Sequence, residues 1–228
     1  MISIKNLSVA YDSNTPVLNQ LNLSMQEHCV HGIVGLNGAG KTTLLNTIFG
    51  FIQADSGSID YQNQPLTKKE ICYLITENYF YSNITGREFL SLFKSNNFDE
   101  NQWNELFHLP LDNIIDGYST GMKKKLALLG MLKQDKPIII LDEPFNGLDI
   151  ESCRIIRSIL LKLKERGKII IVTSHIIETL TNLCDYIHYL EKGQIKYSKT
   201  PTDFANFEQA IFKTIEEQHE DLIEVLLG

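Results

Sequence analysis

The sequence predicts an α/β fold with a mostly parallel sheet. Two runs of β-branched residues, Ile138–Leu141 and Lys168–Thr173, are typical of parallel strands that are covered on both faces. Each run is followed by a segment of helical character, Glu151–Arg166 and Ile176–Asn182. Of the 228 residues, 43% are hydrophobic and 21% are charged, which suits a globular protein with a sizeable core.

The N-terminal part predicts an antiparallel β region that leads into a strand, a turn and a helix. Apolar residues nearly alternate from Ile2 to Val9 and again from Val17 to Met25, as in strands with one buried face. Val30–Val34 is a short apolar strand that runs into a glycine-rich turn. The helix expected over Lys41–Phe49 ends at Gly50, a residue common at helix C-termini.

The middle and the end of the chain predict further elements of one domain over residues 1–228. A helical subdomain inserted at about residues 78–133 contains helices over Glu88–Lys94 and Gln102–Leu109. Tyr186–Leu190 and Gln194–Tyr197 predict a closing hairpin. A short helical tail is expected at about 202–228, where apolar residues recur every three or four positions (Phe204, Phe207, Ile211 and Ile215).

Charge and composition restrict the function. The formal net charge of −7 argues against a general nucleic-acid binder, which needs Lys and Arg to neutralise phosphates, so no nucleic-acid partner is expected. A bilayer-spanning helix needs about 20 apolar residues, and no run here approaches that length, so any membrane role requires a partner that crosses the membrane. Buried free thiols are expected at four scattered positions, namely Cys29, Cys72, Cys153 and Cys184.

A phosphate-binding loop is the strongest motif. Residues 35–42 fit the pattern GxxxxGK[ST] between an apolar strand and an amphipathic helix, the context that the motif requires. Glycines let backbone N–H groups curl around a phosphate chain, and the helix start adds about half a positive charge. Lys41 is expected to reach the β- and γ-phosphates, and the Thr42 hydroxyl is a ligand suited to Mg²⁺. The predicted nucleotide-binding residues of this loop are Gly35, Leu36, Asn37, Gly38, Ala39, Gly40, Lys41, Thr42 and Thr43.

Polar residues follow two of the parallel strands. Asp142 and Glu143 end the first strand, and ligand sites in parallel sheets lie beyond the carboxyl ends of strands. Asp142 is suited to hold Mg²⁺ through water, while Glu143 is suited to orient and polarise an attacking water. His175 follows the second strand in the same way and could donate a hydrogen bond to the γ-phosphate. Lys41, Glu143 and His175 are therefore the candidate catalytic residues.

The segment from Tyr118 to Leu126 resembles the signature motif of ABC ATPases, which are the nucleotide-binding subunits of ABC transporters. That motif is usually Leu-Ser-Gly-Gly-Gln, which Ser119 and Gly121 match and Thr120 does not. The Ser-Thr-Gly-Met variant, followed by a basic run, resembles the exporter-type branch. The other motifs of the family follow in the same order within about residues 2–200. This resemblance implies a RecA-like P-loop NTPase core.

The resemblance assigns several further residues. Tyr11 stands where an aromatic ring stacks on adenine, and Asp149 belongs to the D-loop. The family's sensing loop carries a Gln, but here Thr76 occupies that position with Glu77 next to it, so either could supply oxygen to the metal site.

The resemblance also implies a mechanism and its partners. The cofactors are ATP and Mg²⁺, and two ATPs are held between two chains, an identical or a related pair, arranged head to tail. Ser119, Thr120 and Gly121 then contact the ATP of the second ATPase subunit. The chain is expected to be cytoplasmic, held at the inner face of the cell membrane by an integral membrane permease, with export as the direction. A soluble ABC ATPase that acts on ribosomes or DNA, or another P-loop kinase or GTPase, remains the alternative.

Two clusters have open interpretations at this stage. The aromatic residues of Asn78–Tyr81 are either core packing or a docking point for a membrane subunit. The basic run Lys123–Lys125 predicts a solvated helix face, with a phosphate, a lipid headgroup or RNA as the other contacts to weigh.

Overall fold

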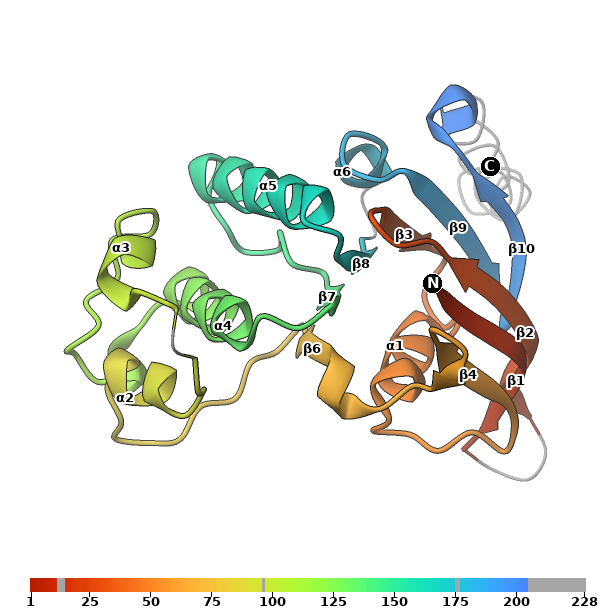
Figure 1. Cartoon of the computed structure of the whole chain (residues 1–228), viewed down its shortest axis with the longest axis horizontal. Helices are drawn as coiled ribbons and strands as arrows, with labels where there is room; N and C mark the ends of the chain where they lie inside the picture. The colour runs from red at the N-terminus through yellow and green to blue at the C-terminus, as the bar shows by residue number, and fades with distance from the viewer. Residues whose placement is uncertain (12–14, 96, 175–176, 205–228) are drawn as a thin grey trace, which may run out of the picture.

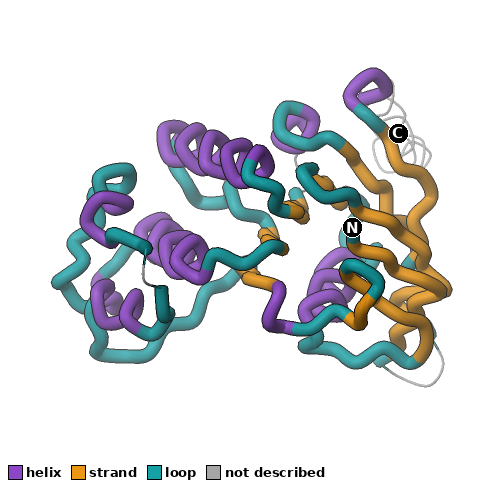
Figure 2. The backbone as a smooth tube through the Cα atoms, viewed as in Figure 1, coloured by secondary structure: helices purple, strands orange, loops and turns teal. Residues whose placement is uncertain are grey.

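Two β-sheets and the helices between and beside them make up the computed structural model, which describes residues 1–11, 15–95, 97–174 and 177–204 (Figure 1, Figure 2). The larger sheet has the strand order β10-β9-β3-β8-β7-β6. Five of its strands are parallel, and β10 pairs antiparallel with β9. Its strands are β3 Val30–Val34, β6 Ile71–Leu74, β7 Ile138–Asp142, β8 Ile169–Thr173, β9 Tyr186–Glu191 and β10 Gln194–Lys199. The mostly parallel sheet predicted from the sequence is confirmed.

The smaller sheet is antiparallel and comes mainly from the N-terminal residues, as predicted. Its order is β2-β1-β4-β5, and its strands are β1 Ile2–Ala10, β2 Pro16–Met25, β4 Ser56–Tyr61 and β5 Gln64–Pro65. The helix α1, Lys41–Phe49, lies between the two sheets (Figure 1). Leu44 and Leu45 of α1 are fully buried in a cluster that also holds Ile2 of β1 and Ile140 of β7. Burial of apolar side chains on both faces of α1 thus joins the sheets.

The remaining helices lie on the other side of the larger sheet (Figure 1). Their bounds are α2 Gly86–Ser91, α3 Glu100–Asn104, α4 Thr120–Gln134, α5 Ile150–Glu165 and α6 Ile177–Thr181. Short 3₁₀ turns occur at Lys68–Glu70, Ile115–Gly117 and Pro201–Asp203. Phe204 is buried, and the rest of the predicted C-terminal tail, 205–228, lies outside the described residues.

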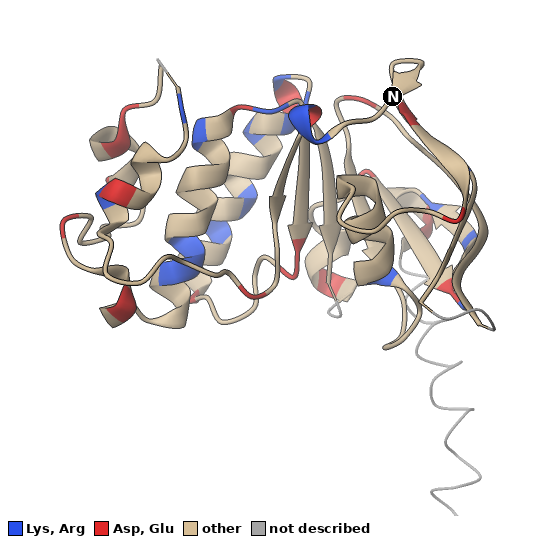
Figure 3. Cartoon of the chain, turned by 90° about the horizontal axis from the view of Figure 1, so that it is seen from below, with Lys and Arg blue, Asp and Glu red and all other residues tan. Residues whose placement is uncertain are grey.

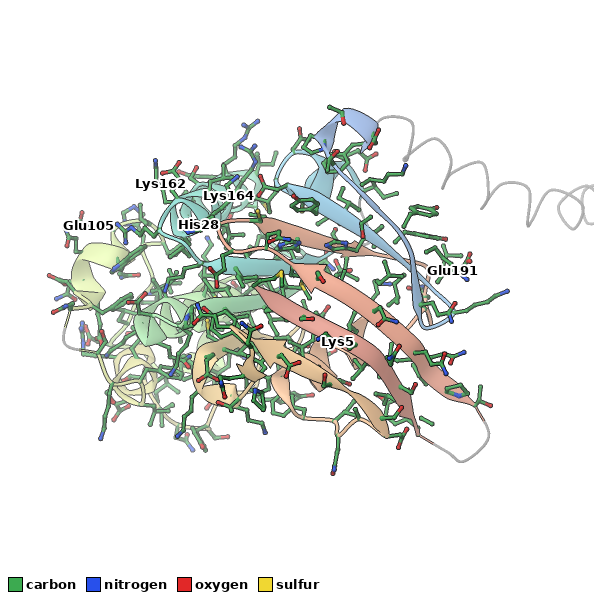
Figure 4. The ribbon with its side chains drawn as sticks, turned by 45° about the vertical axis from the view of Figure 1, so that its right-hand side comes forward. Lys5, His28, Glu105, Lys162, Lys164 and Glu191 are labelled. Carbon is green, nitrogen blue, oxygen red and sulfur yellow. The ribbon has the colours of Figure 1, made fainter. Side chains whose placement is uncertain are left out.

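The tip of the β9–β10 hairpin contacts the glycine-rich loop that precedes α1. Its position is marked by Glu191 in Figure 4. The N–H of Gly193 donates to the carbonyl of Ala39 at 3.2 Å, and its carbonyl accepts from Asn19 N–H at 3.1 Å. A Cβ at Gly193 would approach the carbonyl oxygen of Val17 to 2.3 Å, so this close contact requires glycine. The hairpin therefore ties β2 to the loop that precedes α1.

Two predicted helices, those that correspond to α2 and α3, differ from their predicted bounds by more than one residue at an end. The helix predicted over Glu88–Lys94 begins earlier because the Thr85 hydroxyl and the Glu88 carboxylate form a capping box. The helix predicted over Gln102–Leu109 ends at Asn104. The Asn104 side chain bonds both the N–H and the carbonyl of Leu109, and these bonds replace continued helix.

The thiol prediction is half wrong. All four cysteines are free, but only Cys72 and Cys184 are buried, whereas Cys29 and Cys153 are partly exposed. Burial raises the pKa of the Cys72 thiol to about 12. Within the part of the chain that the structure describes, none of the helices has the length and apolar character needed to cross a bilayer.

Candidate nucleotide-binding site

The turn between β3 and α1 forms a loop that is shaped for an anion. Gly40 precedes α1 with φ 106°, and no side chain caps the helix start. The Lys41 ammonium curls back to donate to the carbonyls of Gly35 at 2.6 Å and Leu36 at 3.2 Å. Gly35 lies against β9, where a Cβ would come within 2.3 Å of the Leu190 carbonyl oxygen. The first N–H groups of α1 therefore face outward with a positive charge beside them, as phosphate binding requires.

A cavity of about 700 Å³ opens over this loop. It brings together the loop, the end of β7 and the segment after β6, as the strand order places them. Its lining residues are Val17, Asn37, Gly38, Gly40, Lys41, Thr42, Thr43, Thr76, Asp142 and Glu143. Most of the residues predicted to bind nucleotide or metal therefore share one cavity, although Gly35, Leu36 and Ala39 form the loop behind it.

Thr173 fixes the two acidic residues at the end of β7. Asp142 pairs in register with Thr173 on the neighbouring strand β8. The Thr173 hydroxyl donates to the Asp142 carboxylate at 2.5 Å and accepts from the Glu143 N–H at 3.1 Å. Glu143 has φ 51°, a left-handed conformation that costs a non-glycine residue about 1 kcal/mol and that surrounding bonds must hold. Figure 3 shows acidic residues in red at the end of a central strand.

Charge in the cavity is balanced between Lys41 and the acidic pair. Burial lowers the pKa of Lys41, and the negative charges of Glu143 and Asp142 oppose that shift. A cation, a carboxylate pair and free helix N–H groups side by side suit a phosphate chain that carries a hard metal ion. The Thr42 hydroxyl and the Asp142 carboxylate are oxygen donors of the kind that Mg²⁺ prefers.

The start of α4 is a second helix start that the sequence predicted to contact an anion, and its residues are not among those that line this cavity. Ser119 caps α4 by accepting a hydrogen bond from the Met122 N–H at 3.3 Å. Ser119 and Thr120 are exposed, and Gly121 is partly exposed. A Cβ at Gly121 would meet the Gly147 carbonyl oxygen at 3.2 Å, so this helix start packs closely on the segment after β7. The signature segment is thus open to a second molecule.

The basic run behind Ser119 is not the solvated face that we predicted. Lys124 is buried, and its ammonium donates to the carbonyls of Glu143 and Asn146, both at 2.9 Å. Lys125 bonds the carboxylate of Asp149 at 3.2 Å. Lys124 lies four and seven residues before buried Leu128 and Met131, and this helical spacing was the signal that predicts an inward-facing side chain.

Asp149 and Tyr11 flank the site. The Asp149 carboxylate caps α5 by accepting from the Ser152 N–H at 2.7 Å and the Ser152 hydroxyl at 2.8 Å. These bonds, with a smaller effect of Lys125, lower the pKa of Asp149. The hydroxyl of Tyr11 lies 3.2 Å from the Thr43 hydroxyl, and the ring is 68% exposed. An exposed aromatic ring therefore stands beside the loop.

The other predicted residues have different positions. Thr76 lines the cavity, whereas Glu77 is not among its lining residues and accepts a long hydrogen bond from the Tyr79 hydroxyl at 3.5 Å. His175 lies outside the described residues. Thr173 was not singled out by the sequence analysis, although a polar residue at the end of an apolar strand beside Asp142 is a usable signal.

Comparisons with known proteins identify the class. A family model described as ABC transporter matches residues 18–146. The ABC transporter ATP-binding protein YtrB of Bacillus subtilis (strain 168) is 32% identical over 206 residues, which cover 86% of this chain and 70% of YtrB. The lantibiotic transport ATP-binding protein SrtF of Streptococcus pyogenes is 29% identical over 218 residues, 92% of this chain and 95% of SrtF.

Solved structures agree with the fold. The ATP binding subunit of an ABC transporter superposes with a TM-score of 0.79 at 25% identity, covering 89% of this chain and 91% of that chain. A dimeric post-hydrolysis state of the ATP-binding cassette MJ0796, bound to ADP and Pi, gives 0.78 at 21% identity, with coverages of 88% and 99%. The chain therefore belongs to the ABC transporter family. It is an ATP-binding subunit that hydrolyses ATP, as the sequence predicted.

Proposed function

We propose that two ATPase subunits, two copies of this chain or this chain and a related one, hydrolyse ATP at composite sites, each built from the cavity of one and the α4 start of the other. The main supporting observation is that one chain has two separate helix starts, those of α1 and α4, that are suited to bind an anion. The cavity over the phosphate loop contains Lys41, Asp142 and Glu143, whereas Ser119 is exposed and is not among the residues that line it. A head-to-tail pair related by a two-fold axis would bring each segment to the other chain's cavity.

Within the cavity, the proposed roles follow from the chemical groups that line it. Lys41 and the N–H groups of the loop hold the β- and γ-phosphates of ATP. Thr42 and Asp142 would hold Mg²⁺, which neutralises phosphate charge when bound. Glu143 orients and polarises the attacking water, because its position after Asp142 puts a second carboxylate at the same strand end.

Other residues complete the proposed site. Tyr11 stacks on adenine, supported by its exposed ring beside Thr43. Thr76, which faces the cavity, takes the sensing-loop position rather than Glu77. His175 is proposed to contact the γ-phosphate on the basis of the family resemblance alone. Asp149 belongs to the D-loop.

From the second subunit, Ser119, Thr120 and Gly121 contact the γ-phosphate. Support comes from the helix start that these residues form and from the exposure of Ser119 and Thr120. ATP then acts as a shared ligand that favours the closed pair, and its hydrolysis lets the pair open.

We also propose that the pair works with an integral membrane permease at the inner face of the cell membrane, and that the direction is export. SrtF, by its name a lantibiotic transport ATP-binding protein, supports a role in transport, and the proposed direction rests on the resemblance of the Ser-Thr-Gly-Met variant to the exporter-type branch. Tyr79 and Tyr81 are 82% and 70% exposed, which suits a docking point for the permease. Phe80 instead packs on Phe89, with ring centroids 4.8 Å apart, and supports the segment from inside. One domain over 1–228 with a helical subdomain at 78–133 remains the proposed organisation.

Exchange of Glu143 tests this function. Glu143→Gln should bind ATP normally, hydrolyse it at least about a hundredfold more slowly, and form a stable dimer with ATP, because the base is lost while the binding groups remain. Steady-state hydrolysis and size-exclusion chromatography with ATP measure the two effects. Glu151→Gln, an exposed acid in the first turn of α5, is the matched control. Hydrolysis at the wild-type rate by Glu143→Gln contradicts the assigned base.

A further inference from the structure

A buried lysine connects the signature helix to the backbone of the proposed catalytic base. Lys124 lies in the second turn of α4 and is only 5% exposed. Its ammonium donates two hydrogen bonds of 2.9 Å, one to the Glu143 carbonyl and one to the Asn146 carbonyl. A charged group that is buried in this way requires specific partners, and here main-chain carbonyls provide them.

These bonds act on a residue with an unusual backbone. Glu143 has φ 51°. Its N–H is held by the Thr173 hydroxyl of β8, and its carbonyl is held by Lys124 of α4. Because the two bonds hold opposite sides of the residue, they fix the direction in which its side chain leaves the backbone.

We propose that Lys124 is a positioning residue for ATP hydrolysis, which holds the Glu143 main chain so that the Glu143 carboxylate faces the cavity. This inference rests on the proposed role of Glu143 as the base. Lys124 is not among the residues that line the cavity, and its two hydrogen bonds go to main-chain carbonyls, so nucleotide binding should not depend on it. It acts on the same loop as Lys125, which bonds Asp149, and together the two lysines attach α4 to the segment 143–149.

The charge and the reach of the ammonium both matter to this role. A lysine presents three donors, and two of them are used on carbonyls that lie three residues apart in the chain. The nearby negative charges of Glu143 and Asp142 favour the charged form, against the effect of burial, which lowers the pKa of Lys124. A methionine has a similar shape and no donor, so it removes the bonds while filling the space.

The same helix supplies a matched control. Lys133 of α4 is also buried, and its ammonium bonds the Leu90 carbonyl at 2.9 Å and the Glu100 carboxylate at 2.6 Å, far along the helix from Glu143. Lys124→Met and Lys133→Met each remove one buried ammonium from α4. They differ in whether the lost bonds reach the loop after β7.

The experiment compares the full-length variants in ATP hydrolysis, ATP affinity and thermal unfolding. Lys124→Met should lower kcat at least about tenfold with KM and the Kd for ATP within about threefold of wild type. Lys133→Met should keep kcat within about twofold, even where it lowers Tm equally. Lys124→Gln, which keeps a neutral donor, should recover part of the lost kcat, and it replaces the methionine variant if that variant does not fold.

The outcomes separate this inference from the proposed function. A slow Glu143→Gln together with a Lys124→Met of normal kcat overturns the positioning role and leaves the base intact. A Glu143→Gln of normal kcat overturns the proposed base, whatever Lys124 does. Equal losses of kcat in Lys124→Met and Lys133→Met would show a merely structural lysine and would also overturn the inference.

Discussion

Two helices in this chain begin in different chemical ways and in opposite surroundings. At the start of α1, Gly40 offers no side-chain cap, and the free N–H groups open into a cavity with Lys41 and two carboxylates. At the start of α4, Ser119 uses its hydroxyl to cap the helix, and the surface around it is exposed. The first helix end lies in a cavity with the groups proposed to bind and cleave a nucleotide, whereas Ser119 at the second is not among the residues that line this cavity.

If the proposed composite site is correct, this difference makes a single chain an incomplete enzyme. An anion-binding helix end is effective where other groups hold the same anion in a partly dry site. The cavity of α1 meets that condition in part, and the α4 start would meet it only against the nucleotide of another subunit. The contacts of Lys124 and Lys125 matter for this reason. They join the exposed start of α4 to the segment after β7, which begins with Glu143 of the cavity.

The largest effect is expected from removal of the charge at the α1 start. Lys41→Met should weaken ATP binding at least about a hundredfold, because a partly buried ammonium beside the phosphates makes charge-assisted bonds that no neighbour replaces. Isothermal titration with ATP measures the affinity. Lys123→Met makes the same charge change on α4 and should stay within about twofold. Near-normal affinity of Lys41→Met would remove the distinction between the two helix ends.

The next largest effect is expected from acid, which should destabilise the strands β3 and β9 beside the α1 site. His31 of β3 and His188 of β9 lie 3.1 Å apart through Nδ1 and Nε2, and His188 Nδ1 lies 2.7 Å from the Ser198 hydroxyl. Burial, and to a smaller extent the charge of His31, lower the pKa of His188 to about 3. The unfolded chain, with a histidine pKa of about 6.5, binds this proton more readily than the folded chain does.

The sign of the pH effect follows from that difference. The stabilisation is complete above pH 6.5 and is lost as the pH falls towards 3, so the free energy of unfolding should drop by about 2 kcal/mol between pH 6.5 and pH 5 on account of His188. Urea unfolding at several pH values measures this slope. His188→Gln should show a smaller slope over the same range, whatever its stability at pH 7. Equal slopes would show that the pair titrates normally.

The two helix ends also differ in how far the sequence predicted them. The phosphate loop was predictable because each of its positions has a local requirement, such as a glycine turn after an apolar strand. The strands β7 and β8 were predictable because Ile138 to Leu141 and Ile169 to Val172 are uniformly apolar. Asp142 and Glu143 followed from parallel-sheet geometry.

The surroundings of α4 were predictable only in part, because contacts distant in sequence decide them. Ser119 marks the helix start locally, and the spacing of Lys124 to Leu128 and Met131 indicates an inward-facing side chain, but the carbonyls that accept its hydrogen bonds lie on a loop that begins 19 residues later at Glu143. A run of three lysines indicates solvent exposure unless such a loop covers one of them. In the same way, the Asn104 side chain ends α3 through bonds to Leu109 that no periodicity of apolar residues reveals.

The smallest expected effect is also the most direct test of the comparison. Ser119→Asn keeps a good N-cap, so α4 should begin at the same residue and Tm should change by less than about 2 °C. The larger amide should disturb only what approaches Ser119 from outside, so ATP affinity of the single chain should stay within about twofold while kcat falls about tenfold. In a mixture with an excess of Glu143→Gln, which offers an intact Ser119, the activity per Ser119→Asn chain should rise, because its own cavity then receives a normal α4 start. If mixing leaves that activity unchanged, Ser119 acts within its own chain, and the two helix ends do not belong to different halves of one site.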